Sequence, residues 1–239
     1  MIFGGIQKNS LIDYPSKVSC VLFTQGCNFR CPYCHNPRLI PCRQKGSATI
    51  PADEVLSFLA QRKNWLDGVV VTGGEPTLQK DLFGFCGQLK EMGFSIKLDT
   101  NGSRPEAIEK LINGRRVDYI AMDIKTDPDR YAPVFTAIED VRCIRESINT
   151  ILASGLDHEF RTTCVKPFVD ADAIRVIGHS IGGAQKYVLQ QAQYIEGHVL
   201  DPGFFKTQDW QFDAALLSTL CDIAAGFVKA CCIRWAPQP

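Results

Sequence analysis

The chain has 239 residues, of which 45% are hydrophobic, and its 26 basic residues balance 26 acidic ones. This length and hydrophobic content suffice for one sizeable core. The balanced charge gives no long-range attraction to nucleic acid, no apolar run approaches the roughly 20 residues of a membrane-spanning helix, and Met1 to Gly5 lack the features of a signal peptide. We therefore expect a cytoplasmic protein that binds neither nucleic acid nor membrane.

Short β-rich runs alternate with amphipathic stretches along the chain. Gly68 to Thr72 is continuously apolar, as in strands whose two faces are both covered. Six βα units predict a parallel sheet with right-handed crossovers, either as an incomplete barrel or as an open doubly wound layer. The predicted strands are 19–24, 68–72, 95–99, 119–123, 159–165 and 186–190, and the predicted helices are 52–62, 81–92, 105–113, 140–154, 170–181 and 212–227.

Polar residues and glycines follow the predicted strands. In parallel α/β folds, functional groups gather at the carboxyl ends of the strands. We therefore expect a functional site where these strand ends meet. The segments concerned are 24–27, 72–75, 99–102, 123–125, 166–167 and 190–191.

Three cysteines, Cys27, Cys31 and Cys34, lie within eight residues on the loop after the first predicted strand. In a reducing cytoplasm, clustered cysteines more often bind metal or do chemistry than form disulfides. Three thiolates on so short a loop can bind three irons of a [4Fe–4S] cluster and leave the fourth iron open to a substrate or cofactor. The alternative is a zinc site with His35, although ligands adjacent in sequence seldom fit one tetrahedron. Cys42 is the nearest further cysteine, and its spacing does not suit a fourth ligand.

The other cysteines are scattered, mostly in apolar surroundings. We expect six of them to be small buried hydrophobic side chains. Cys231 and Cys232 form a vicinal pair, which we expect at the end of a buried apolar helix or strand because adjacent cysteines have poor geometry for a mutual disulfide. An exposed redox function is the alternative for this pair. The six scattered cysteines are Cys20, Cys42, Cys86, Cys143, Cys164 and Cys221.

The pattern of Cys27, Cys31, Tyr33 and Cys34 resembles the C-x3-C-x-aromatic-C motif of the radical S-adenosylmethionine (SAM) superfamily. The resemblance implies a partial (β/α)6 TIM-like barrel of parallel strands with outer helices. It implies a single radical SAM domain over 1–239, with a core of about 15–195 and a C-terminal helical tail of about 201–239.

The same resemblance implies one [4Fe–4S] cluster, held by the three cysteines, and SAM as cofactor. SAM binds the open iron, and its reductive cleavage yields a radical that abstracts hydrogen from a substrate. Tyr33 would lie against the adenine of SAM; the alternative is an aromatic side chain that packs the loop onto the barrel.

Gly73, Gly74 and Glu75 resemble the GGE motif of this superfamily and follow the cysteines by one βα unit. Glycines permit a close approach of the backbone to a ligand. The Glu75 carboxylate can accept a charge-assisted hydrogen bond from the methionine ammonium of SAM. The alternative is an ordinary βα turn.

Asp99, Thr100, Asp123 and Lys125 resemble strand ends of the glycyl-radical-enzyme activases. The resemblance implies a monovalent cation bound by Asp99, Thr100 and Asp123, because two carboxylates beside the SAM carboxylate repel one another without countercharge. Asp99, Asp123 and Lys125 would then bind SAM, with Lys125 facing its carboxylate as a point charge. The alternatives are a turn with a helix N-cap after Asp99 and a solvated surface lysine at Lys125.

Segments 7–17, 23–27 and 34–37 resemble the anaerobic ribonucleoside-triphosphate reductase activating proteins, within a general resemblance over roughly 1–195. This implies an anaerobic oxidoreductase that abstracts hydrogen from a glycine of a glycyl-radical enzyme, the anaerobic ribonucleotide reductase. It also implies an electron donor such as flavodoxin or ferredoxin. Residues 43–74 contain no cysteine, so we expect a single cluster.

Two other functions stay open at this point. One is a radical SAM enzyme that acts on a small molecule, like 7-carboxy-7-deazaguanine synthase; the context of Asp13, Tyr14 and Pro15 favours the activase. The other is a non-catalytic iron–sulfur or zinc-binding module, against which the GGE motif and the open iron argue. For Asp13 and Tyr14 themselves we expect a capping and packing pair before the first strand, with contact to a partner as the alternative.

Overall fold

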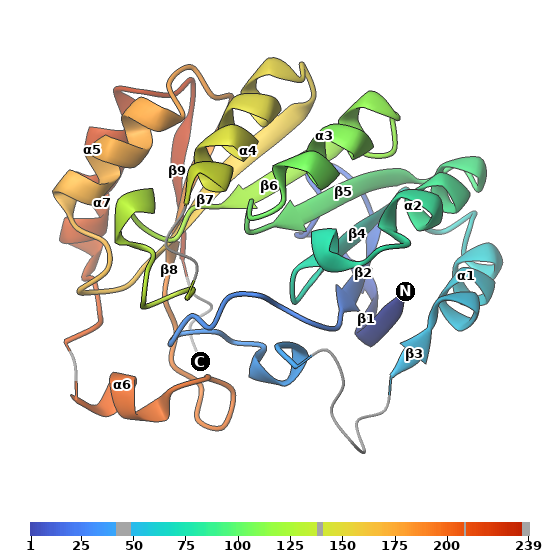
Figure 1. Cartoon of the computed structure of the whole chain (residues 1–239), viewed down its shortest axis with the longest axis horizontal. Coiled ribbons are helices and arrows are strands. Elements are labelled where there is room, and N and C mark those ends of the chain that lie inside the picture. The colour runs from blue at the N-terminus through green and yellow to red at the C-terminus, as the bar shows by residue number, and fades with distance from the viewer. Residues whose placement is uncertain (42–48, 138–140, 208, 236–239) are drawn as a thin grey trace. The chain divides into compact units, whose positions relative to one another are not determined.

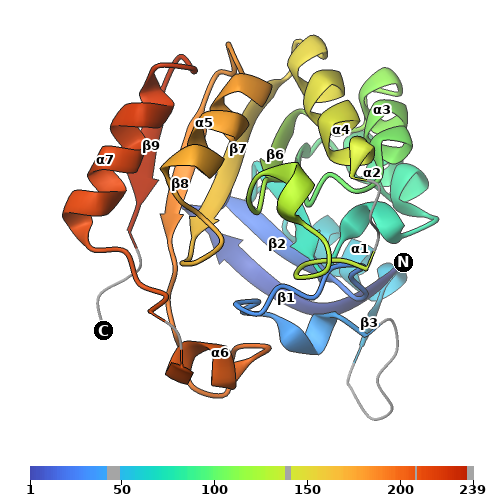
Figure 2. The same ribbon diagram turned by 60° about the vertical axis from the view of Figure 1, so that its left-hand side comes forward.

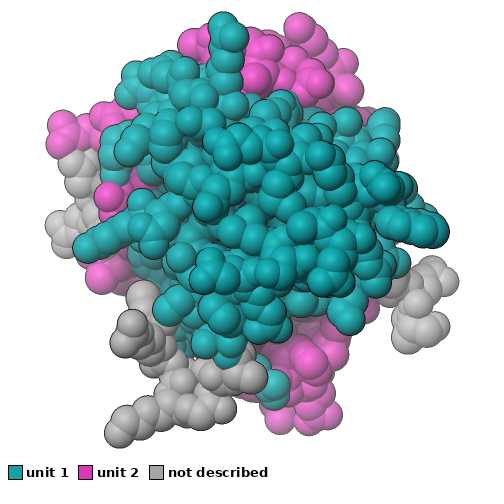
Figure 3. Space-filling model, turned by 90° about the vertical axis from the view of Figure 1, so that its right-hand side faces the viewer, with its two compact units in different colours: residues 1–28, 38–100, 106–120 teal, residues 29–37, 101–105, 121–239 magenta. Residues whose placement is uncertain are grey.

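The computed structural model describes residues 1–41, 49–137, 141–207 and 209–235, and Figure 1 labels its elements. The chain divides into two compact units, which Figure 3 colours separately. A single domain over 1–239 stays a prediction. Unit 1 comprises Met1–Asn28, Arg38–Thr100 and Glu106–Ile120, and unit 2 comprises Phe29–Pro37, Asn101–Pro105 and Ala121–Pro239.

The strands of unit 1 follow one another in the order β3-β1-β2-β4-β5. The pairs β2–β4 and β4–β5 are parallel, with Ser19 opposite Gly68 and Gly68 opposite Ser95. β1 and β3 are antiparallel additions at the edge, which were not predicted from the sequence. The bounds are β1 Ile2–Ser10, β2 Ser19–Thr24, β3 Ile50–Pro51, β4 Gly68–Gly73 and β5 Ser95–Thr100.

The helices that accompany these strands bury one apolar stripe each. In α3 the buried residues are Ile108 and Leu111, three positions apart, as expected for the inner face of a surface helix. α2 is followed by Gly93, whose φ of +92° suits glycine at a helix end. The helices are α1 Ala52–Gln61, α2 Leu82–Glu91 and α3 Pro105–Asn113, with short 3-10 helices η1 Pro37–Leu39 and η2 Pro76–Leu78.

β6, Tyr119–Asp123, begins with the last two residues of unit 1 and ends in unit 2, where the order is β6-β7-β8-β9. The pairs β7–β8 and β8–β9 are parallel. α5 and α7 pack side by side, and α7 lies along β9 (Figure 2). The bounds are β7 Asp157–Cys164, β8 Tyr187–Gln191, β9 Cys231–Arg234, η3 Pro128–Arg130, α4 Arg142–Ala153, α5 Ala171–Ser180, α6 Pro202–Thr207 and α7 Ala214–Ala225.

All six predicted strands and all six predicted helices are present, with bounds within two residues of the prediction. The predicted start of α4, Asp140, lies outside the described residues. The C-terminal tail is not purely helical as expected, because β9 closes it and pairs with β8. None of the helices in the described ranges is long and apolar enough to cross a membrane.

The scattered cysteines are partly as predicted. Burial raises the pKa of Cys20, Cys86 and Cys164 to about 12, as for small interior side chains. Cys143 and Cys221 are only half-buried, and Cys42 lies outside the described residues. The vicinal pair is on a strand, but its predicted burial is wrong: Cys231 is half-buried and Cys232 is exposed because β9 has solvent on one face.

Candidate functional site

Glycines bring the carboxyl ends of β2 and β4 together in unit 1. The Gly74 N–H donates to the Thr24 carbonyl at 2.9 Å, and the Glu75 N–H donates to the Gly26 carbonyl at 2.7 Å. A Cβ on Gly74 would lie 2.0 Å from the Gly26 oxygen, and Gly73 has a φ of +115°. Both positions therefore require glycine for backbone reasons alone.

Glu75 is buried, with 1% of its surface exposed. Its Oε1 accepts three hydrogen bonds: from the Thr77 N–H at 3.1 Å, from Thr77 Oγ1 at 2.6 Å and from Thr100 Oγ1 at 2.8 Å. These donors offset the cost of burying a carboxylate and fix its orientation. The structure thus brings two predicted residues, Glu75 and Thr100, together. The bond from the Thr77 N–H also caps η2. An ordinary βα turn and a SAM-binding role are therefore both consistent with the observed position of the Glu75 side chain.

The first part of the cysteine loop is held by the chain that returns after the loop. The buried Gln25 amide donates to two carbonyls of residues 38–41, at 2.9 and 2.7 Å. The N–H groups of Gly26 and Cys27 donate to two more, at 2.6 and 3.0 Å. This role of Gln25 was not predicted from the sequence, since it depends on a return of the chain that no local pattern indicates.

The loop enters unit 2 after Asn28 and carries Cys31 and Cys34, whose peptide groups form a turn with Cys34 N to Cys31 O at 2.9 Å. Burial raises the pKa of Cys34, while a backbone hydrogen bond from Asn36 and the charge of Lys125 lower it in part. Across the described ranges, no three Cys, His, Asp or Glu side chains form a group that could hold one metal ion. A [4Fe–4S] cubane does not require such a group, because each of its thiolate ligands binds a different iron.

Tyr33, between these cysteines, has 4% of its surface exposed. Its ring packs against Phe135 and Phe168, with centroid distances of 5.9 and 6.1 Å. Its Oη is buried without a hydrogen-bond partner among the described residues, which costs free energy unless a further group binds there. Tyr33 thus packs the loop, as one alternative predicted, and also presents a polar atom that a ligand could satisfy.

Asp123 and Lys125, both half-buried, form a charged group with the buried Arg161 in unit 2. Asp123 lies 2.7 Å from Arg161 Nε and 3.2 Å from Lys125 Nζ. Burial opposes the charge of Asp123, but Arg161 and Lys125 outweigh it and hold its pKa well below the ordinary range. Burial likewise opposes the charge of Lys125, but Asp123, Cys31 and Tyr131 outweigh it and raise its pKa. With 13% of its side chain exposed, Lys125 is not the solvated surface lysine of the alternative.

Asp99 at the end of β5 forms an ion pair with Lys97, whose side chain is buried. Residues two apart on a strand share a face, which explains the pairing. After β5, the Ser103 N–H donates to Asn101 Oδ1 at 2.9 Å and Gly102 has a φ of +75°, so the predicted turn is present. Neither Lys97 nor Arg161, the partner of Asp123, was predicted as a site residue. The sequence indicated them only as basic residues inside apolar strands.

The segment 200–204, in the tail for which the sequence suggested no role, lies on the cysteine loop within unit 2. The N–H groups of Leu200 and Asp201 donate to the carbonyls of Cys34 and Pro32 at 3.1 and 3.0 Å. Phe204 stacks on Phe168, with 5.4 Å between centroids and 13° between ring planes. Through Phe168 the segment also supports the ring of Tyr33.

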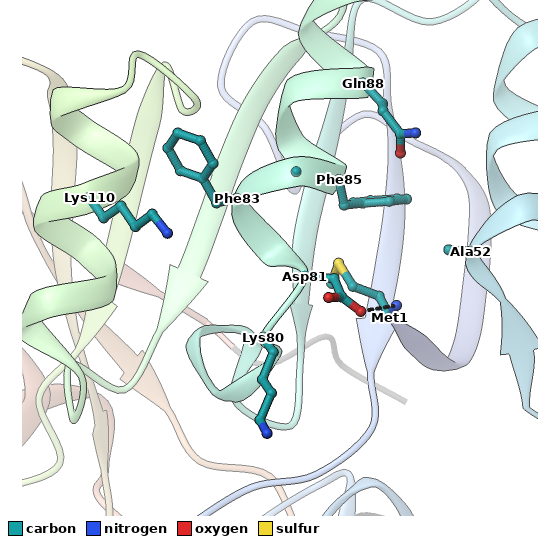
Figure 4. A pocket seen from close by; sticks show the side chains of 9 residues that line it. Met1, Ala52, Lys80, Asp81, Phe83, Phe85, Gln88 and Lys110 are labelled. Carbon is teal, nitrogen blue, oxygen red and sulfur yellow. Dashed lines mark hydrogen bonds and ion pairs between the residues drawn. The ribbon is translucent and has the colours of Figure 1, made fainter.

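A separate pocket of about 430 Å³ lies in unit 1 beside α2 (Figure 4). Lys80, Phe83 and Lys110 line it, and the Met1 amino group lies 3.4 Å from the Asp81 carboxylate. None of the site residues predicted from the sequence is among its lining residues. We therefore do not assign the chemistry of the strand ends to this pocket.

Residues 21–178 match the radical SAM superfamily. A protein of Methanocaldococcus jannaschii with the provisional name glycyl-radical enzyme activating enzyme is 37% identical over 195 residues, which cover 80% of this chain and 79% of that protein. The pyruvate formate-lyase-activating enzyme of Clostridium pasteurianum is 34% identical over 135 residues, which cover 53% of each chain.

Solved structures share the fold. SuiB of Streptococcus suis bound to its precursor peptide SuiA superimposes with a TM-score of 0.67 at 14% identity, covering 86% of this chain and 44% of that chain. SuiB has also been solved bound to S-adenosylmethionine. The likeness confirms the predicted α/β class and partial barrel of parallel strands. The chain spans about half the length of SuiB and of the Clostridium enzyme.

Proposed function

The chain belongs to the radical SAM superfamily, and from this premise we propose that it is an activase that abstracts hydrogen from a glycine of a glycyl-radical enzyme. The observation that carries the proposal is the 37% identity to the Methanocaldococcus protein over 80% of this chain. Enzymes of the superfamily with unrelated reactions share the cysteine motif. The match to the Methanocaldococcus protein extends well beyond that motif, so it is more specific. The Clostridium relative supports the same class.

Membership in the superfamily implies one [4Fe–4S] cluster and SAM, and we propose that Cys27, Cys31 and Cys34 hold the cluster. When bound, the pair supplies an electron and a cleavable sulfonium, and hence the radical that abstracts hydrogen. The donor set fits a cluster, because three thiols lie on one short loop and thiolates are the ligands of iron–sulfur clusters.

The proposed SAM-binding residues are Tyr33, Gly73, Gly74, Glu75, Asp99, Asp123 and Lys125. Glu75 would accept from the methionine ammonium, since three donors already orient its carboxylate. Lys125 would face the carboxylate of SAM, since its raised pKa keeps it protonated at neutral pH. Tyr33 would contact the adenine side, where its hydroxyl has no partner among the described residues.

A monovalent cation at Asp99, Thr100 and Asp123 is a separate part of the proposal. Lys97 pairs with Asp99, and Lys125 pairs with Asp123. These ammonium groups already supply the countercharge for which the cation was invoked, so a bound cation has to add to the two pairs or replace them. Dependence of SAM cleavage on potassium or sodium tests this part; salt-independent cleavage contradicts it without touching the activase.

We propose the anaerobic ribonucleotide reductase as the partner, because segments 7–17 and 34–37 resemble the activating proteins of that enzyme. Flavodoxin or ferredoxin would supply the electron, in a cytoplasm that keeps thiols reduced. The tail beyond Asp201 falls outside that resemblance, so it gives no support for this partner over another glycyl-radical enzyme.

The test is an anaerobic reaction of the reconstituted chain with SAM, dithionite and a candidate partner. We expect 5′-deoxyadenosine and, in the partner, the electron paramagnetic resonance signal of a glycyl radical. Anaerobic ribonucleotide reductase and pyruvate formate-lyase are compared side by side. A signal in the lyase alone contradicts the reductase as partner, and the absence of a signal in every glycyl-radical enzyme contradicts the activase.

A further inference from the structure

Two thiols that the proposed function does not use lie in contact within unit 2. Cys221 is on α7 and Cys231 is on β9, and their Sγ atoms are 3.2 Å apart. Both side chains are free thiols and half-buried. Neither belongs to the loop of Cys27, Cys31 and Cys34, so the pair is independent of the proposed cluster.

The backbone around this contact is fixed by packing. β9 pairs with β8 in a parallel register that sets Cys231 opposite Tyr187, and α7 packs along both strands. A disulfide has an S–S distance of about 2.05 Å, so the two sulfurs need to close by only about 1 Å. Side-chain rotation can supply a movement of that size while the helix and the strand stay in place.

The 3.2 Å contact places each thiol where it can resolve a mixed disulfide formed on the other. Burial, followed by the hydrogen bond with Cys221, raises the pKa of Cys231, so we assign the first attack on an external disulfide to Cys221 and the resolving step to Cys231. Cys164 is a third thiol of this neighbourhood and is fully buried. Cys232, the sequence neighbour of Cys231, is exposed and reports on any oxidant that reaches β9.

We propose that Cys221 and Cys231 are an oxidative modification site, which forms a reversible disulfide with a low-molecular-weight disulfide as oxidant. Cys221–SH and Cys231–SH react with R–S–S–R to give the Cys221–Cys231 bond and two R–SH. The two protein thiols lose two electrons and two protons, and the reagent disulfide takes them up. The bond joins the last helix to the last strand of the described chain.

Trypsin offers a direct test, because Lys229 separates the two cysteines into peptides 207–229 and 230–234. The anaerobically purified holoenzyme is treated with oxidised glutathione, its remaining thiols are blocked with N-ethylmaleimide, and it is digested without reduction. We expect most of Cys221 in a cross-linked pair of these peptides, which dithiothreitol separates. Fragmentation of the pair assigns the bond to Cys231 or to Cys232.

Three variants make the result specific. Cys221→Ser and Cys231→Ser should lose the cross-linked pair, while the neighbouring Cys232→Ser should retain it. A Cys232–glutathione adduct in wild type shows that the oxidant reached β9. If Cys221 stays fully alkylated while this adduct forms, or if fragmentation places the bond at Cys232, the proposal is wrong, and the wild-type protein alone suffices to show it.

Discussion

Two carboxylates of the proposed site have several polar partners within their own units. Glu75 accepts three hydrogen bonds on one oxygen, and Asp123 is paired with Arg161 and Lys125. Removal of one partner of a fully buried ion pair costs about 3–5 kcal/mol, and the cost is smaller at Asp123, whose side chain is 28% exposed. Substitutions here must therefore preserve the packing if an effect on binding is to be separated from an effect on folding.

Glu75→Gln meets that requirement, because an amide oxygen can accept the same three hydrogen bonds. We expect the variant to keep its cluster and to bind SAM roughly ten- to a hundredfold more weakly, since a charged acceptor for the ammonium becomes neutral and such bonds contribute about 1.5–3 kcal/mol. Equilibrium dialysis with labelled SAM measures the change. Glu91→Gln, at the exposed end of α2, is the matched control. Equal affinities in the two variants would remove Glu75 from the SAM site.

Asp123 predicts a pH dependence of stability. Because its pKa is lower in the folded than in the unfolded chain, the stability that it contributes is present above its unfolded pKa of about 3.8 and is lost as the pH falls further. The difference in unfolding midpoint between wild type and Asp123→Asn should be constant from about pH 5 to 8 and shrink below about pH 4.

Urea unfolding followed by circular dichroism measures this difference at each pH, with Asp222→Asn on the exposed side of α7 as control. If the difference stays constant below about pH 4, the partners of Asp123 do not lower its pKa in the folded chain. For Lys125 the pH dependence of stability has the opposite sign. Because its pKa is raised in the folded chain, the stability that it contributes is present at neutral pH and is lost as the pH rises through that pKa.

Glu75, Asp123 and Lys125 could be chosen from the sequence because each follows a predicted strand and belongs to a segment that resembles a motif of the family. Their partners could not. Arg161 is on β7 and reaches Asp123 on β6, and this contact depends on which strands become neighbours. Lys97 lies within β5 itself, but a lysine in an apolar strand gives no indication of whether it faces solvent or the interior.

At the scale of elements, the hydrophobic patterns predicted those strands and helices that pack against a neighbouring layer. Strands β2, β4 and β5 and their helices were predicted within two residues, because both faces of each strand are largely buried. β3 and β9, with two and four residues, are too short for any period and exist because a neighbouring strand pairs with them. β1 contains two glycines and a polar end, so its alternation is weak.

The segment 200–204 is the element whose role was least visible in the sequence. Phe204→Ala removes the ring that stacks on Phe168, and an aromatic pair contributes about 0.5–1.5 kcal/mol beyond its buried area. We expect a looser cysteine loop, measured as a lower iron content after gel filtration and as faster bleaching of the cluster absorbance by a chelator.

Phe83→Ala on α2 is the control, because it removes a half-buried ring from unit 1, where the 200–204 segment has no part. Its iron content should match wild type. If Phe204→Ala also retains iron and bleaches at the wild-type rate, the segment covers the cysteine loop without supporting it.

At the scale of the whole molecule, the proposed SAM-binding residues lie far apart in the sequence. Glu75 and Lys125 are assigned to the ammonium and the carboxylate of the same methionine group. This assignment requires both side chains to contact the same ligand. Thermodynamic coupling between the two side chains is therefore a direct measure of it, and it needs neither a partner enzyme nor turnover.

We expect Glu75→Gln and Lys125→Ala to be non-additive in SAM affinity. Once either group is lost, the methionine end of SAM is less well held, so the second substitution should cost less than it does alone, with a coupling of about 0.5–3 kcal/mol. Dissociation constants of wild type, both single variants and the double variant give this term. Lys166→Ala replaces Lys125→Ala in the control cycle, since Lys166 belongs to unit 2 but pairs with Asp209 at the surface. That cycle should be additive within about 0.3–0.5 kcal/mol. Additivity in both cycles would show that Glu75 and Lys125 do not share a ligand, and one of the two assignments would then be wrong.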